Sequence, residues 1–172
     1  KNIIIVKLMI FLFISKKNSE VIPEITAVNI QDQKVQSFSF SFPEEREQEL
    51  TFSEPLKYLY EPNGSILTAG AYKTVATRFN VQKIDSNTHL YTSQEFVDTF
   101  PGRKFGIEAL IRPHRPDIEK HFPERKANVT TRNYPLSPEA LKKKTGLNDG
   151  GEKFLIGFSG GQKKYLAVAH RV

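Results

Sequence analysis

The sequence contains no cysteine among its 172 residues. This absence excludes disulfide bonds, iron–sulfur clusters, cysteine-ligated zinc and catalysis by a thiolate. It also fits a cytoplasmic location, which is the location we predict. Large apolar groups are plentiful, because the chain has 13 Phe and 6 Tyr and is 38% hydrophobic. We therefore expect one medium core or two small ones.

The chain also lacks an apolar run of the roughly 20 residues that a membrane span needs. Its first residues, KNIIIVKLMIFLFIS, are apolar but interrupted by Lys7, and neither an initiating Met nor a small-residue cleavage site accompanies them. These features differ from those of a signal peptide. We expect this segment to form a buried strand or helix of a larger domain, and we expect no membrane among the partners.

Charges of the two signs are unevenly distributed. Residues 1–100 carry 10 Lys and Arg against 12 Asp and Glu, whereas residues 101–172 carry 15 against 7, a net charge of +8. A basic region of this kind indicates an anionic partner, most simply the phosphates of a nucleic acid. The alternative is a solvated basic surface without a partner.

The first half of the chain shows a β pattern followed by a helical one. Alternation over residues 24–42 predicts an antiparallel hairpin with Phe38, Phe40 and Phe42 on one face. Two strands alone are marginally stable in water, so this hairpin needs further packing. We interpret the acidic run at 44–49 as a solvated connector or the start of a strand.

The next stretch predicts a small α/β unit. Helical spacing of apolar residues indicates one helix over residues 64–79, with Asn63 as its N-cap. A short strand is predicted over 89–93 and a helical turn over 94–99. Proline and glycine at positions 101 and 102 mark a boundary after this unit.

The last part of the chain carries the clearest pattern. A strand over 105–111 precedes a short helix between two prolines, and a second strand over 127–132 precedes a helix that starts at Ser137 and ends near Gly146. Two final strands flank a glycine turn at 160–161. The order β-α-β-α-β-β predicts an α+β sandwich with its helices on one face of the sheet.

Several stretches together resemble a known family, namely YLYEPNGSILTAGAYK, NTHLYTS, FPGRKF, NVTTRNYPLSPEALKKK and DGGEKFLIGF. In this order they resemble the C-terminal region of bacterial class I S-adenosylmethionine-dependent methyltransferases. In that group a Rossmann-type catalytic domain is followed by a ferredoxin-like module and a THUMP-like domain. The word ferredoxin-like here describes a chain topology.

The resemblance implies three parts of the chain. Residues 1–52 would be the terminal β-hairpin of the methyltransferase domain, residues 53–99 the ferredoxin-like module and residues 100–172 the THUMP-like domain. No glycine-rich loop followed by an acidic residue and no Asn-Pro-Pro-Tyr motif is present. We therefore expect no catalytic, cofactor or metal site in this chain, which alone would be an inactive part of a transferase. S-adenosylmethionine would bind to an upstream domain of the same polypeptide.

THUMP domains in general bind RNA and present it to an attached enzyme, so the resemblance implies a tRNA or rRNA partner. Lysine and arginine side chains would provide affinity by releasing counterions from the phosphates. The alternative is a structural or protein-interaction module whose basic face is only solvated. The candidate RNA-binding residues are Arg103, Lys104, Arg112, Arg115, Arg125, Lys126 and Arg132, with a second group of Lys142, Lys143, Lys144, Lys163 and Lys164.

Two further motifs, one typical of hydrolases and one of metal sites, are only weakly supported by their sequence context. The run Gly157 to Gly161 fits the G-x-S-x-G pattern of a hydrolase, but that motif needs a helix after the serine. A strand is predicted there, so a hairpin turn is the better interpretation. His114, Asp117, His121 and Glu124 could ligate a metal, yet their helix is short and its polar face is expected to be polar in any case.

Overall fold

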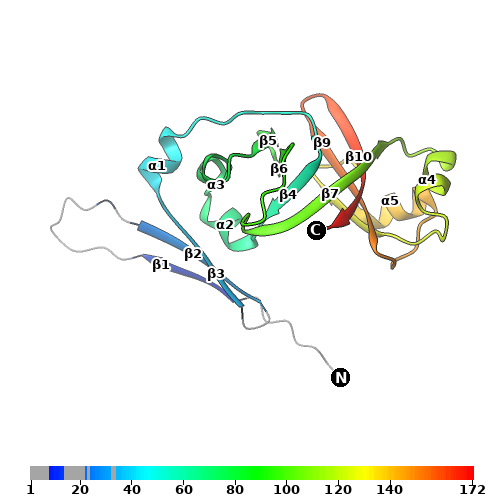
Figure 1. Cartoon of the computed structure of the whole chain (residues 1–172). Coiled ribbons are helices and arrows are strands. Elements are labelled where there is room, and N and C mark those ends of the chain that lie inside the picture. The colour runs from blue at the N-terminus through cyan, green and yellow to red at the C-terminus, as the bar shows by residue number, and fades with distance from the viewer. Residues whose placement is uncertain (1–7, 14–21, 23, 32–33) are drawn as a thin grey trace, which may run out of the picture.

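In the part of the chain that the structure describes, the backbone forms two β-sheets and five short helices (Figure 1). The computed structural model describes residues 8–13, 22, 24–31 and 34–172. A three-stranded sheet has the order β1-β2-β3, and a seven-stranded sheet has the order β5-β6-β4-β7-β10-β9-β8. The elements are β1 (Leu8–Phe13), β2 (Glu24–Gln31), β3 (Lys34–Ser41), α1 (Phe42–Glu47), β4 (Tyr58–Pro62), α2 (Gly64–Ala69), α3 (Tyr72–Arg78), β5 (Gln82–Asp85), β6 (Thr88–Ser93), β7 (Gly102–Ile111), α4 (Arg115–His121), β8 (Asn128–Arg132), α5 (Pro138–Thr145), β9 (Lys153–Gly160) and β10 (Lys163–Arg171).

The predicted hairpin near the N-terminus is present as β2 and β3, paired from Glu24↔Ser41 to Gln31↔Lys34. Residues 32 and 33, between the two strands, lie outside the described residues. Phe38 and Phe40 enter a core shared with α2 and α3, which supplies the packing that the hairpin needs. The prediction was wrong for Phe42, which begins α1 and is 53% exposed.

The acidic run at 44–49 was predicted to be a connector or a strand, but its first four residues are helical. The Ser41 hydroxyl accepts a hydrogen bond from the N–H of Glu44, whose carboxylate accepts one from the N–H of Ser41. This capping box starts α1. The Glu45 carboxylate also accepts hydrogen bonds from the N–H groups of Lys73 and Thr74, at 2.7 and 2.8 Å. It thereby caps α3, whose N-cap residue offers no side-chain hydrogen bond of its own.

The single helix predicted over 64–79 is two helices, α2 and α3. Gly70 ends α2 in the left-handed region, with φ of +82°, which only glycine adopts at little cost. Asn63 occupies the N-cap position of α2, but its side-chain amide donates to Gln36 Oε1 at 2.7 Å and caps no backbone group. The helical turn predicted over 94–99 is irregular.

The seven-stranded sheet curls until its two ends approach each other. Thr88 at the start of β6 donates to the carbonyl of Ser159 in β9 at 2.6 Å, and the Asn133 amide donates to Thr88 Oγ1 at 3.0 Å. The N–H of Gly161 donates to Asp85 Oδ2 at 2.8 Å. The concave face encloses an inner core of Leu59, Ile84, Leu90, Phe105, Ile156, Phe158, Ala167 and Ala169.

The outer face of this sheet carries two separate cores. One lies under α2, α3 and the three-stranded sheet, and the other lies under α4 and α5. In α5 the predicted cap is confirmed, because the Ser137 hydroxyl accepts from the N–H of Ala140 and Gly146 ends the helix with φ of +68°. None of the described helices is long and apolar enough to cross a bilayer.

A β-bulge in β7 decides which core its side chains enter. Ile107 pairs with Ala169 and Ala109 pairs with Val168, so Glu108 is the extra residue. Before the bulge Phe105 and Ile107 face the inner core, and after it Ala109 and Ile111 face the outer core under α4 and α5. A strict alternation would have put all four side chains on one face.

Among the glycines, Gly102 is the one where an added Cβ would come nearest to backbone atoms, and we predict that Gly102→Ala destabilises the fold. A Cβ at this position would lie 2.0 Å from the carbonyl oxygen of Glu61 and 2.8 Å from Pro62 Cα, both backbone atoms. We expect a loss of about 3 kcal/mol in the free energy of unfolding, measured with denaturant. Gly106→Ala is the control, because its Cβ would meet only the ring of the exposed His170. Equal losses in the two variants would contradict the prediction.

Candidate nucleic-acid interface

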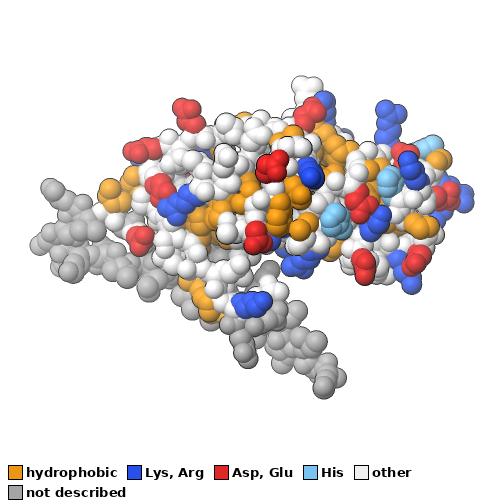
Figure 2. All heavy atoms as spheres, viewed as in Figure 1, with side chains coloured by type: hydrophobic (Ala, Val, Ile, Leu, Met, Phe, Trp, Pro, Cys, Tyr) orange, Lys and Arg blue, Asp and Glu red, His pale blue; other side chains and the backbone are white. Residues whose placement is uncertain are grey.

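A hollow between α4 and α5 gathers basic side chains. It has a volume of about 320 Å³ and is lined by Pro113, Ile118, Thr145 and Gly146 together with the cations of Arg115, Arg125, Lys143 and Lys144. Figure 2 shows Lys and Arg side chains recurring over this end of the molecule, with acidic side chains between them. We call this feature the α4–α5 hollow.

Local structure places each of these cations. Arg115 is the first residue of α4 and is followed by a proline suited to the first turn of a helix. Arg125 adopts a positive φ of 56° in the turn before β8. Lys143 and Lys144 lie in the last turn of α5, where cations complement the helix dipole.

One carboxylate serves two of the four cations. Glu119 Oε1 accepts from Arg115 Nε at 2.8 Å and from Arg125 Nη2 at 2.5 Å. The hydrogen bond from Arg115 lowers the pKa of Glu119, which stays ionised at neutral pH. Within the described part of the chain, Lys143 and Lys144 have no ion-pair partner. The four cations of the hollow therefore face one anion, and the hollow is electropositive.

The predicted RNA-binding residues fall into two classes, and the first is free of ion pairs. Its members are exposed and form no ion pair with any residue that the structure describes. They are Arg112, Lys126, Lys143, Lys144 and Lys164. Lys120 and Arg171 share these properties and were missed. For Lys120 the signal was available, because the spacing of Ile118 and Phe122 defines the buried face of α4 and leaves Lys120 outside.

The second class is partly neutralised by acidic neighbours. Lys142 binds Asp149 at 2.9 Å, Lys104 binds Asp98 at 3.1 Å, and Lys163 pairs with Glu54. Arg115 and Arg125 share Glu119 in the hollow. Such exposed pairs contribute little to stability, so these cations can exchange their partner for a phosphate.

Arg103 and Arg132 also belong to the second class, but their partner is buried. Glu61 in β4 has a side chain only 9% exposed, and its two oxygens lie 2.5 Å from Arg103 Nη2 and 2.5 Å from Arg132 Nε. Arg103 is the cross-strand neighbour of Glu61 in β7, whereas Arg132 ends β8 at the far edge of the sheet. This Glu61 clasp joins the middle of the sheet, at β4 and β7, to its edge strand β8. The sequence analysis missed this ion pair. The signal was available, because Glu61 lies two residues after Leu59 on a strand and therefore faces the same, inner side of the sheet.

The other motifs take structural positions. Ser159 lies in β9 opposite Lys164 of β10, so the G-x-S-x-G run is a strand-turn-strand hairpin. His114, Asp117 and His121 line a separate hollow of about 850 Å³ beside β7. Asp117 Oδ2 accepts from the backbone N–H of Arg112 at 3.3 Å. Across the described residues, no group of three or more His, Asp or Glu side chains has an arrangement that could hold a metal ion.

Known proteins resemble this domain pair. Residues 58–101 match the family described as a ferredoxin-like domain, and residues 102–171 match the family described as THUMP domain-like. The chain thus contains a ferredoxin-like and a THUMP-like domain, joined in one sheet by β4 and β7. The predicted division into residues 1–52, 53–99 and 100–172 stays a prediction. No curated protein matches the chain significantly.

A solved structure extends the likeness to most of the chain. It is the crystal structure of a protein described as a "putative methyltransferase" from Porphyromonas gingivalis W83, with 36% sequence identity and a TM-score of 0.78. The match covers 87% of this chain and 38% of that one. The present chain therefore spans well under half the length of this relative.

We predict that Glu61→Gln destabilises the fold by breaking the clasp. Loss of one partner from a buried ion pair costs about 3–5 kcal/mol. Because the two arginine side chains are 42% and 35% exposed, we expect a smaller loss of about 2 kcal/mol in the free energy of unfolding. Glu108→Gln is the control, since Glu108 pairs with Lys153 and His170 at the surface. A loss in Glu61→Gln no larger than in this control would show that the clasp is dispensable.

Proposed function

We propose that this chain is the RNA-binding, substrate-positioning region of an S-adenosylmethionine-dependent methyltransferase. The observation that carries the proposal is the α4–α5 hollow, where four cations face one carboxylate. The THUMP-like family of residues 102–171 supports an RNA ligand, because RNA binding is general among THUMP domains. The similarity to a protein described as a putative methyltransferase supports the attached chemistry.

The hollow suits phosphate groups in general and no particular base. Lysines and arginines that contact phosphates release condensed counterions, which provides affinity without sequence readout. Arg115 and Arg125 hold their guanidinium groups in place through Glu119, while Lys143 and Lys144 remain free to reach a phosphate. The free cations Arg112 and Lys126 would extend the contact along α4 and the start of β8.

Catalysis would take place outside this chain. We propose that the cofactor S-adenosylmethionine binds to a methyltransferase domain in the same polypeptide, and that β1, β2 and β3 form the terminal strands of that domain. The described part of this small sheet supports the idea, because Val35 on its outward face is 65% exposed. The substrate would be tRNA or rRNA in the cytoplasm, positioned by the THUMP-like domain.

We predict that replacing Lys143 and Lys144 together by alanine weakens RNA binding and its salt dependence. The measurement is fluorescence anisotropy of the 172-residue chain with bulk tRNA over a salt series. Each lost phosphate contact lowers the slope of log K against log salt by roughly 0.7–0.9, so we expect a decrease between about one and two. Alanine suits the helix, so α5 should remain folded.

The matched control removes the same charge elsewhere, by replacing Lys34 and Lys57 with alanine. Both lysines are exposed, and they belong to β3 and to the segment before β4. An unchanged slope in the control and a lower slope in the Lys143 and Lys144 variant would support the α4–α5 hollow as the interface. Absence of salt-dependent binding by the unmodified chain would overturn the proposal and favour a protein-interaction module.

A further inference from the structure

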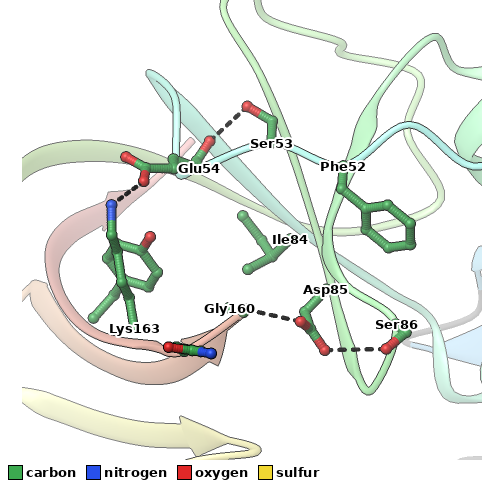
Figure 3. Close-up of a pocket in the computed structure, with 11 residues that line it drawn as sticks. Phe52, Ser53, Glu54, Ile84, Asp85, Ser86, Gly160 and Lys163 are labelled. Carbon is green, nitrogen blue, oxygen red and sulfur yellow. Dashed lines mark hydrogen bonds and ion pairs between the residues drawn. The ribbon is translucent and has the colours of Figure 1, made fainter.

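A third hollow lies where the two domains meet at the open side of the curled sheet. It has a volume of about 490 Å³. The ferredoxin-like domain contributes β5 and the turn that follows it, and the THUMP-like domain contributes the β9–β10 hairpin. Segment 52–54 forms the remaining wall. We call this feature the seam hollow (Figure 3).

The walls of the seam hollow are fixed by interactions behind them. Lys83 is 1% exposed, and its ammonium group donates to the carbonyls of Asp85 and Ser86, both at 2.6 Å. The Asp85 carboxylate accepts from the N–H of Gly161, which ties the two domains together. Gly160 lets the hairpin approach closely, because a Cβ there would lie 2.8 Å from Ile84 Cγ2. The hollow is therefore formed before any ligand arrives.

The ring of Phe52 lies at the rim and stacks on no other aromatic side chain among the residues that the structure describes. Backbone hydrogen bonds hold the two neighbours of Phe52. The N–H of Ser53 donates to the carbonyl of Lys83 at 3.1 Å, and the N–H of Lys83 donates to the carbonyl of Thr51 at 2.9 Å. The side chain of Phe52 is nevertheless 52% exposed. Figure 3 shows the Phe52 ring on one side of the hollow, with Ile84 between it and the ion pair of Glu54 and Lys163. The apolar floor continues to the half-buried Tyr165.

The rim offers polar groups of the kinds that a nucleobase needs. Backbone N–H bonds from Asn87 and Gly161 lower the pKa of Asp85, so this carboxylate is an acceptor at neutral pH. Glu54 is a second acceptor, and the Gln162 amide can donate and accept. Lys163, which lines the hollow, suits a phosphate. The volume falls in the range of small-molecule sites.

We propose that the seam hollow binds a single unpaired nucleobase carrying an amino group, stacked on Phe52. Stacking on an exposed ring is the usual way in which proteins hold unpaired bases. The amino group would donate to Asp85 or Glu54, and the adjoining phosphate would lie near Lys163. The inference rests on the proposed function, because the base would belong to the RNA that the α4–α5 hollow holds by its phosphates.

The test uses the 172-residue chain and a single-stranded oligouridylate that contains one 2-aminopurine. Anisotropy of an end label reports binding, and quenching of 2-aminopurine fluorescence reports stacking. We expect quenching with the unmodified chain. Phe52→Ala should abolish the quenching and weaken binding by about fivefold or more, the lower end of what one stacked base contributes. Its salt slope should be unchanged, because no charge is lost.

Phe42→Ala is the matched control, because Phe42 is 53% exposed and lies in α1, away from the seam hollow. It should bind and quench like the unmodified chain. Phe52→Trp should retain the quenching, which separates loss of the stack from loss of folding. Binding without quenching, or equal effects of the two alanine variants, would overturn the inference and leave the proposed function standing. Absence of binding by the unmodified chain would overturn both.

Discussion

Backbone pairing between β4 and β7 is the interaction on which the rest of the structure depends. Five register pairs, from Tyr58↔Gly106 to Pro62↔Gly102, join the first strand of one domain to the first strand of the other. Without them the ferredoxin-like strands would end in an open edge. The same pairing sets Glu61 beside Arg103, and Arg132 from the far edge completes the clasp. The two family matches thus describe parts of one sheet and share its inner core.

In this arrangement some basic side chains stabilise the fold and others are exposed to solvent. Arg103 and Arg132 lie on the concave side, where they compensate a buried carboxylate. Lys143 and Lys144 lie on α5, outside the sheet, and have no anionic partner in the described part of the chain. The same residue types therefore hold the fold together at one place and present charge at another. The net charge of a segment does not tell which of its cations are paired and which are free, because ion pairs form between residues far apart in the sequence.

Local signals explain what could be predicted. The ends of α5 could be predicted from Ser137, Pro138 and Gly146, because helix capping depends only on neighbouring residues. The β9–β10 hairpin could be predicted for the same reason, from its glycine turn. The break at Gly70 and the bulge at Glu108 were missed, since helical and alternating patterns continue through both. For the site, the basic region was predicted from composition. The α4–α5 hollow could not be predicted, because it depends on how two helices pack against each other. The seam hollow could not be predicted either, because it depends on the curl of the sheet.

The curl also governs the order in which the chain can fold. Its inner core contains both Leu59, near the start of the ferredoxin-like domain, and Ala169, near the end of the THUMP-like domain. These distant residues must meet before the core excludes water. On a ribosome the ferredoxin-like strands emerge before the β9–β10 hairpin, whose side chains complete their inner core. Long-range pairing of this kind slows folding, and a chain interrupted before β9 would leave Leu59, Leu90 and Phe105 uncovered. During synthesis the inner core therefore stays incomplete until β9 and β10 have been made.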